Sequence, residues 1–284
     1  MYKQVAGTGD VDIQYTVQGL LALLGDSPGQ AEDAAIRRAI LSYVRMRDWD
    51  AIQDFLSSAI AEETFEALDL QSLLQAIIQT GTLDAYVYAV AISNLVLEDD
   101  ALVENCVPIA LWVIQTVLVQ DLKTVIEDGD LEDLYFEIRN LVGILAREEA
   151  VFEALENILL EAKGRHGSHG IGLLIEMYLE AGEGQWGKSE ALVRELIEHL
   201  EDDEYAGPVL AGLVLTLLSV SSSFYSLAYD IVLALFTAGL SFDRSGMLRQ
   251  LDGLDEGGAE VPKARQEMLE LLKARQFDEE YMIL

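Results

Sequence analysis

Two histidines and an arginine lie close together in the segment 163–170, which reads KGRHGSHG. His166 and His169 are three residues apart, so both could bind one metal ion if a third ligand came from elsewhere. The segment is also glycine-rich and precedes an expected helix, so Arg165 and the backbone amides could hold an anion. Its spacing matches neither the phosphate loop nor the dinucleotide fingerprint. A metal site and an anion site are therefore alternatives to a solvated loop between helices.

A calcium loop and the common catalytic motifs are excluded. Asp128, Asp130 and Glu132 have the spacing of calcium ligands. However, Asp133 stands where the loop needs glycine, and Arg139 stands where it needs a bidentate glutamate. Neighbouring carboxylates are expected by chance in a chain with 50 Asp and Glu residues. Because no nucleophile elbow and no zinc-protease motif is present, we expect no enzymatic activity and no cofactor.

The single cysteine and the third histidine have simple structural explanations. Cys106 is followed by apolar residues, which indicates a buried core thiol, and one cysteine cannot form an intramolecular disulfide. His199 lies among glutamates, which indicates a solvated helix face. The cysteine content and the lack of a secretory signal at the N-terminus predict a cytoplasmic protein.

Helical periodicity dominates the chain and predicts an all-α fold. The segment 130–147 has apolar residues at a spacing of about 3.6, as in an amphipathic helix. The valine-rich segment 107–119 predicts a helix that begins at Pro108. Glycines that follow apolar helical runs predict helix ends. These are Gly25, Gly81, Gly164, Gly182 and Gly239.

The predicted helices form pairs at a regular interval. The approximate hairpins are 10–47, 48–81, 82–128, 130–167, 168–206 and 207–246. A period of about 40 residues is typical of α-solenoids. Over residues 10–246 the chain resembles the HEAT and armadillo class of helical repeats in period and layout, although the Asp and Arg expected of HEAT units do not recur in register. The resemblance implies a solenoid of stacked hairpins; the alternative is a compact multi-helix bundle.

Composition divides the chain into four parts. A flexible tail at 1–9 precedes the helical-repeat domain at 10–250, and a Gly/Asp linker at 251–260 leads to a C-terminal amphipathic helix and tail at 261–284. This helix is either a cap on the acidic body or a tethered element that engages a partner. Its candidate partner-binding residues are Lys263, Arg265, Lys273 and Arg275.

An uncharged run at 205–229 reaches the length of a membrane span. Several serines interrupt the run, and an acidic block at 201–204 precedes it without flanking basic residues. We therefore predict two buried helices with a serine-rich turn and no membrane span. Asp230 shares a helical face with Ser223, Ser226 and Thr237, so it should meet solvent.

The net charge of −32 on a chain that is 51% hydrophobic predicts a large core inside a carboxylate coat. Such a coat is typical of proteins kept soluble at high salt, and it also attracts basic partners. Direct nucleic-acid binding is disfavoured because no dense Lys/Arg stripe exists. We expect a non-enzymatic scaffold or adaptor for another protein. The alternatives are an acidic decoy that occupies the nucleic-acid site of a basic partner and, third, a small-ligand or metal-binding helical protein; the oligomeric state is left open.

Overall fold

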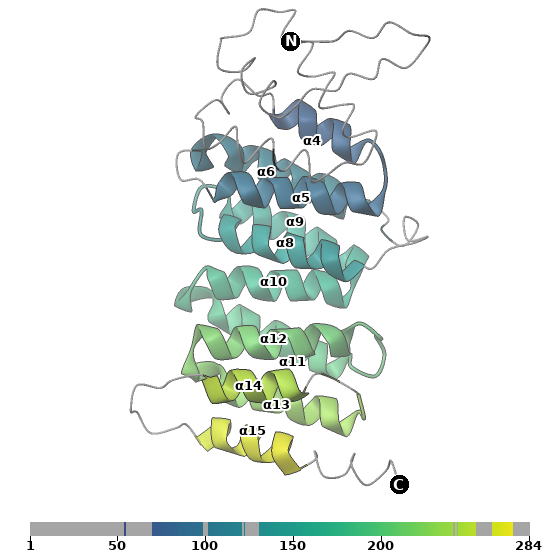
Figure 1. Ribbon diagram of the computed structural model, residues 1–284. Coiled ribbons are helices and arrows are strands. Elements are labelled where there is room, and N and C mark those ends of the chain that lie inside the picture. The colour runs from purple at the N-terminus through teal and green to yellow at the C-terminus, as the bar shows by residue number, and fades with distance from the viewer. Residues whose placement is uncertain are drawn as a thin grey trace, which may run out of the picture. The chain divides into compact units, whose positions relative to one another are not determined.

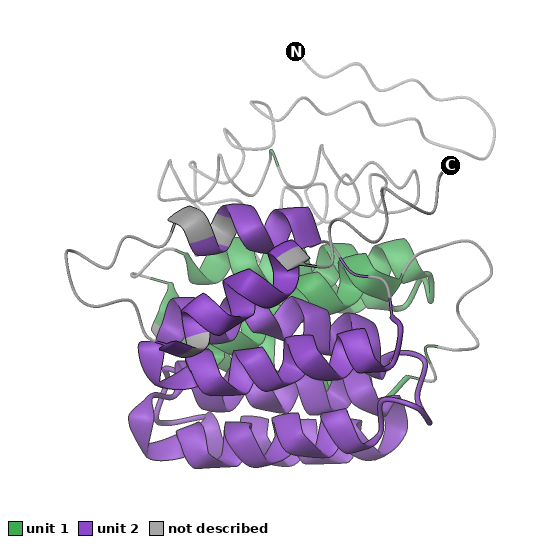
Figure 2. Cartoon of the chain, turned by 90° about the horizontal axis from the view of Figure 1, so that it is seen from below, with its two compact units in different colours: residues 1–145 green, residues 146–284 purple. Residues whose placement is uncertain are grey.

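The computed structural model describes most of the chain from Leu70 to Ala274. The described residues are 54, 70–98, 102–120, 122, 131–240, 242, 244–253 and 263–274. Every regular element in them is a helix, which confirms the all-α prediction. The predicted tail at 1–9, the hairpin at 10–47, most of the hairpin at 48–81, and Arg275 lie outside the described residues. The chain separates into unit 1, residues 1–145, and unit 2, residues 146–284, which Figure 2 colours differently.

Unit 1 is built around one helix that contacts three others. Its described helices are α4 (Leu70–Ile78), α5 (Leu83–Leu97), α6 (Val103–Leu118) and α8 (Leu131–Leu145), labelled in Figure 1. Helix α5 packs against α4, α6 and α8. The Nδ2 group of Asn94 donates to the backbone carbonyl of Glu137 at 3.0 Å and to its Oε2 at 2.8 Å. This amide therefore fixes the position of α5 on α8.

Unit 2 contains seven α-helices among its described residues. They are α9 (Phe152–His166), α10 (Ser168–Glu180), α11 (Trp186–Glu198), α12 (Ala206–Val220), α13 (Tyr225–Thr237), α14 (Arg244–Gly253) and α15 (Lys263–Ala274). Helix α10 packs against α9, α11 and α12, and α13 packs against α12 and α15. All residues of α10 except His169 and Glu180 are buried. The reason is its nearly uniform apolar sequence, which leaves no side of the helix suited to water.

Three of the predicted hairpins contain two described helices that pack against each other. The segments 82–128, 168–206 and 207–246 hold α5 with α6, α10 with α11, and α12 with α13, and Leu122 is a further described helical residue of the first segment. In the segment 130–167, α8 belongs to unit 1 and α9 to unit 2. Within unit 2, close contacts join helices that are one or two places apart in the chain. Such packing is compatible with a solenoid-like arrangement of helices.

Two predicted helix boundaries were wrong. Helix α6 begins at Val103, so Pro108 lies inside it and not at its start. A proline costs one helical hydrogen bond, but Cys106 and Val107 are buried before it and extend the packed face toward the N-terminus. Helix α9 likewise continues through Gly164 to His166 and ends at Gly167, whose φ is 55°. A glycine ends a helix where its φ becomes positive, not merely where it occurs.

The uncharged run at 205–229 folds as predicted into two helices and a serine turn. Helix α12 is followed by a 3₁₀ turn at Ser222–Phe224 and then by α13. In the part of the chain that the structure describes, no helix is both long enough and apolar enough to cross a bilayer. Asp230 has a side chain that is 44% exposed, and Ser223, Ser226 and Thr237 are exposed on the same face. The prediction that Asp230 meets solvent is confirmed.

The helix before the predicted linker at 251–260 is longer than expected. Helix α14 extends to Gly253, three residues into the predicted linker at 251–260, because Leu251 is fully buried in the core of unit 2. The rest of that linker lies outside the described residues. The predicted amphipathic helix is present as α15, with Met268 and Leu272 fully buried in the same core.

Candidate functional site

The predicted anion or metal residues lie at the corner between α9 and α10. Arg165 forms an ion pair with Glu161, one turn earlier on α9, at 3.0 Å. His169 is half-buried, and its ring packs on Tyr205 with ring centroids 4.9 Å apart. His166, the last residue of α9, is also half-buried. Arg165 thus contacts its own helix, and His169 contacts the turn before α12 (Ala206–Val220).

The glycines of this corner allow the backbone of α10 to approach α9 closely. Gly167 links the two helices with a positive φ of 55°, which favours glycine. A Cβ added to Gly170 would lie 2.6 Å from the Cα of Lys163 and 2.7 Å from the carbonyl oxygen of Ala162. Such distances are shorter than van der Waals contact, so no other residue fits without moving a helix. Close helix packing therefore accounts for Gly170, and the positive φ accounts for Gly167.

A carboxylate of the chain itself fills the anion position at the start of α10. The Oδ2 atom of Asp203 accepts hydrogen bonds from Ser168, at 3.2 Å from the backbone N–H and 2.6 Å from the hydroxyl. Its Oδ1 atom accepts from the backbone N–H of Tyr205 at 3.0 Å. A helix N-terminus favours negative charge because its first N–H groups have no helical partner. An external anion would have to displace Asp203.

These bonds also control the ionisation of Asp203. Burial alone would raise the pKa of its carboxyl group. The hydrogen bonds from Ser168 and Tyr205 and the neighbouring His169 outweigh burial, so the pKa is lower than usual. Asp203 is therefore a charged cap on α10 at neutral pH.

A metal site has no support among the described residues. In that part of the chain, no three His, Cys, Asp or Glu side chains are grouped so that they could hold a metal ion. Cys106 is buried as predicted, and burial raises the pKa of its thiol, which disfavours the reactive thiolate. His199 is exposed as predicted, and its Nδ1 lies 2.8 Å from the carbonyl oxygen of Glu195.

The basic residues of α15 divide into buried and exposed positions. Arg265 is only 7% exposed, and its guanidinium donates to the carbonyl oxygen of Leu251 on α14. Lys263 is exposed and forms an ion pair with Glu267, one turn later, at 3.0 Å. Lys273 is exposed at the other end of the helix. Binding of a partner by Lys263, Lys273 and Arg275 stays a prediction, whereas Arg265 already has a structural role inside unit 2.

Helices α9 and α11 are joined by two ion pairs that sequence reasoning did not find. Glu156 pairs with Lys188 at 2.8 Å, and Lys163 pairs with Glu195 at 2.7 Å. On each helix the two partners are about two turns apart, and the residue numbers rise together. The two helices therefore run parallel and in register. Arg194 of α11 continues this series to α13, since its guanidinium lies 3.8 Å from Asp230.

The pair between Glu156 and Lys188 also includes a buried tyrosine of α10. The Tyr178 hydroxyl donates to Glu156 at 2.6 Å, and the Lys188 ammonium lies 4.7 Å from the centre of the Tyr178 ring. The bonds from Lys188 and Tyr178 lower the pKa of Glu156. Burial and the bond to Glu156 strongly raise the pKa of Tyr178. The arrangement thus keeps Glu156 charged and Tyr178 protonated, as expected of a structural network.

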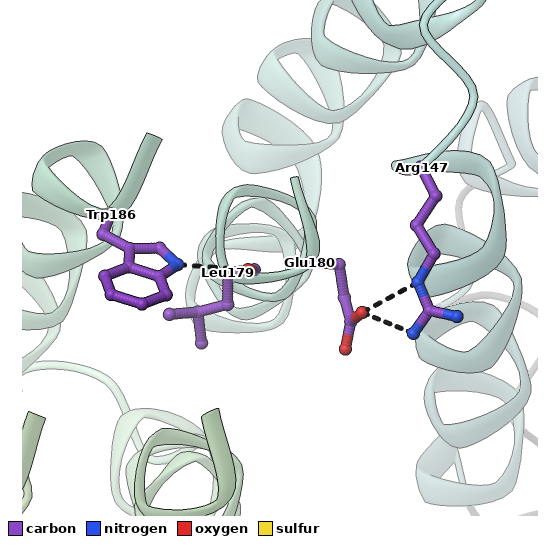
Figure 3. Close-up of polar contacts among 4 residues, drawn as sticks. All are labelled: Arg147, Leu179, Glu180 and Trp186. Carbon is purple, nitrogen blue, oxygen red and sulfur yellow. Dashed lines mark hydrogen bonds and ion pairs between the residues drawn. The ribbon is translucent and has the colours of Figure 1, made fainter. Parts of the chain in front are cut away.

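Polar contacts also hold the C-terminal end of α10 from two sides (Figure 3). The Arg147 guanidinium donates to Glu180 Oε2 at 3.1 Å from Nε and 2.6 Å from Nη2. On the opposite side, the indole N–H of Trp186 donates to the carbonyl oxygen of Leu179 at 3.3 Å. Trp186 begins α11, so these bonds fix both the end of α10 and the start of the next helix.

Most basic residues of unit 2 contact groups of the same unit. Besides the pairs above, the Arg244 guanidinium lies 4.6 Å from the centre of the Phe236 ring. By contrast, four carboxylates at the turn from α11 to α12 are exposed, and no ion pair joins them to a basic residue of the described part of the chain. We call this group the acidic turn; it comprises Glu198, Glu201, Asp202 and Glu204. The outward charge of unit 2 is therefore strongly negative.

Comparison with known proteins adds no assignment to this picture. The chain matches no protein-family model, no curated protein and no solved structure at the significance required.

Proposed function

We propose that this protein is a non-enzymatic scaffold or adaptor whose helical hairpins stack as in HEAT and armadillo solenoids and whose acidic surface binds a basic protein. Stacked hairpins provide an extended surface on which another protein can lie. The proposal concerns binding because Cys106 is buried, His169 packs on Tyr205, and Tyr178 and Glu156 form a hydrogen-bonded network between helices.

The distribution of charge carries this proposal. Lys163, Lys188 and Arg194 are engaged in ion pairs between helices, so each neutralises the carboxylate that it contacts and not the acidic turn. The acidic turn remains exposed beside them. A surface with this imbalance attracts basic partners over distances of about one Debye length, close to 8 Å at physiological salt.

Adaptation to high salt is the competing explanation of the same charge, and melting in KCl separates the two. Self-repulsion of carboxylates is screened by salt. If the carboxylates are an adaptation to high salt, helicity measured by circular dichroism should be lost at low KCl. If the carboxylates serve binding, the protein should remain folded at low KCl, and basic proteins should then be screened as partners.

Affinity capture tests the proposal itself. The full chain, immobilised at physiological salt, should retain a specific protein of high isoelectric point, and about 0.5 M KCl should release it because exposed charges are then screened. Recovery of no specific partner would refute the scaffold proposal.

The same experiment distinguishes an adaptor from a nucleic-acid decoy. A decoy occupies the site where its partner binds DNA, so added DNA should compete for the captured protein. An adaptor uses another surface of its partner, so DNA should leave the captured amount unchanged. The exposed carboxylates of the acidic turn are compatible with either role.

A further inference from the structure

Helices α5 and α8 of unit 1 carry three carboxylates along the line where they pack against each other. The bond from Asn94 to Glu137 shows which side of each helix meets the other. Residues four positions apart lie on the same side of a helix, so Glu98 lies beside Asn94 on α5. Asp133 likewise lies beside Glu137 on α8. We call Glu98, Asp133 and Glu137 the acidic edge; the first two are exposed and the third is half-buried.

The described helices α5 and α8 place no basic residue against the acidic edge. The sequence of α5 contains no Lys or Arg, and Arg139 is the one basic residue of α8. Arg139 lies two positions after Glu137, which is about 200° around the helix, so it lies on the side away from α5. At the contact between α9 and α11, by contrast, Lys163 and Lys188 neutralise carboxylates of the facing helix. The acidic edge is therefore complementary to a cation from outside the chain.

A hydrogen-bond acceptor and an exposed aromatic ring adjoin the acidic edge. Asn94 is 9% exposed, and its Oδ1 has no hydrogen-bond partner among the described residues, whereas its Nδ2 is used by Glu137. Buried polar atoms of this kind normally have a partner, so Oδ1 lacks a donor. Phe136, which precedes Glu137, is 58% exposed, and a guanidinium can stack on such a ring. Carboxylates, an amide oxygen and an aromatic face together match the groups that arginine binds.

We propose that the acidic edge holds an arginine side chain of the basic partner. The guanidinium pairs with the carboxylates, donates to Oδ1 of Asn94 and stacks on Phe136. Arginine fits better than lysine because its planar fork presents five N–H donors to several acceptors at once and stacks on rings. This inference rests on the proposed function, since it names the residue of the basic partner and the surface of unit 1 that binds it.

The probe for this site is a short fluorescent peptide of alternating glycine and arginine, titrated into the full chain at physiological salt. Glu98→Gln, Asp133→Asn and Glu137→Gln together neutralise the acidic edge, and glutamine can still accept the bond from Asn94. This variant should bind the peptide about tenfold more weakly by anisotropy. The matched control removes the same charge from exposed positions of unit 2, at Glu149, Glu153 and Glu183, each replaced by glutamine. It should bind within about twofold of the unchanged chain.

The chemistry of the peptide and the signal of Asn94 test the details. A citrulline peptide, which keeps the shape but not the charge, should bind about tenfold more weakly, and a lysine peptide about threefold more weakly. The side-chain amide signal of Asn94 in a nitrogen-15 NMR spectrum, assigned as the one missing in Asn94→Ser, should shift when the arginine peptide binds.

Equal weakening in the acidic-edge variant and its control, with helicity retained, would overturn the site, because the whole acidic surface would then attract the peptide. Should the acidic-edge variant fail to fold, the unchanged chain decides, and peptide binding that leaves the Asn94 signal unmoved would contradict the proposal. Equal affinity for the lysine peptide would contradict the choice of arginine. The peptide is not a cellular partner, so its failure to bind is distinguishable from a failure to capture a basic protein.

Discussion

Lys163 and Glu195 form the same type of ion pair between α9 and α11 as Glu156 and Lys188, with the order of the charges reversed. Their distances are 2.7 Å and 2.8 Å. Each helix therefore presents one acid and one base, two turns apart, to a neighbour with the opposite pattern. Because only a parallel, in-register alignment satisfies both pairs, the arrangement selects against other packings of these helices.

Reversing one of these charges should destabilise unit 2. Lys163→Glu places two carboxylates opposite each other, and both side chains are about one third exposed, at 32% and 33%. We expect the free energy of unfolding, measured in urea, to fall by about 1 kcal/mol. Adding Glu195→Lys restores an ion pair of opposite direction and should recover much of the loss. If the loss of unfolding free energy in the double variant equals the sum of the losses in the two single variants, the pair contributes nothing to stability.

The network around Tyr178 should make stability depend on alkaline pH. Its folded-state pKa is raised above the unfolded value, so the stabilisation is present below about pH 10 and is lost as pH rises toward the folded pKa. Glu156 has a lowered pKa and behaves oppositely, losing its contribution as pH falls below about 4. Urea titrations above pH 10 should therefore show a steeper loss for the unchanged chain than for Tyr178→Phe.

The matched control for that experiment is Tyr205→Phe, because this tyrosine is 42% exposed. It should follow the pH dependence of the unchanged chain. Identical curves for all three proteins above pH 10 would contradict the buried hydrogen bond between Tyr178 and Glu156.

Removal of the Asp203 cap on α10 should lower the stability of the protein, and the size of this loss should depend on pH in the acid range. Asp203→Ala leaves Ser168 and the start of α10 without their acceptor, which should lower the free energy of unfolding by about 1–2 kcal/mol. The folded pKa of Asp203 is lowered, so its contribution is present above the unfolded pKa of about 3.9 and disappears as pH falls through the folded value. The neighbouring exposed variant Asp202→Ala should have little effect at any pH, and equal effects of both would argue against a cap.

Two glycines of α9 and α10 should respond oppositely to the same substitution. In Gly170→Ala the new methyl group meets the backbone of α9, which cannot move without separating the helices. We expect a loss of about 1–3 kcal/mol in chemical unfolding. Gly164→Ala meets nothing within 4 Å and should be neutral or stabilising by up to about 1 kcal/mol. A harmless Gly170→Ala would mean that the close crossing does not exist in solution.

Periodicity predicted the helices because each helix buries one face, and this local pattern is visible in the sequence. The segment 130–147 contains α8, and the buried Leu134, Ile138 and Leu145 belong to its predicted apolar stripe. Boundaries were less predictable, since tertiary packing decided them. Leu251 extends α14 because the core of unit 2 accepts its side chain, and nothing in the local sequence indicates this.

The candidate site could be predicted only as a set of unusual residues. The sequence identifies the glycines and histidines at 163–170, but Asp203, whose carboxylate binds Ser168 of this segment, lies 35 positions after Ser168. The same is true of the ion pairs between α9 and α11, whose partners are 32 positions apart. Such pairs become apparent only when the register of two helices is known. Likewise, Arg265 was identified by its charge, while its contact with Leu251 depends on how α15 packs.

The most direct test of the central claim compares capture of a basic partner by the unchanged chain and by a variant with a neutral acidic turn. That variant carries Glu198→Gln, Glu201→Gln, Asp202→Asn and Glu204→Gln, all at exposed positions. A matched control replaces the same number of exposed serines by asparagine, at Ser219, Ser222, Ser223 and Ser226. Binding through the acidic surface predicts that the neutral variant retains about tenfold less partner and that the serine control retains the normal amount. Equal capture by all three proteins, each with intact helicity, would contradict it.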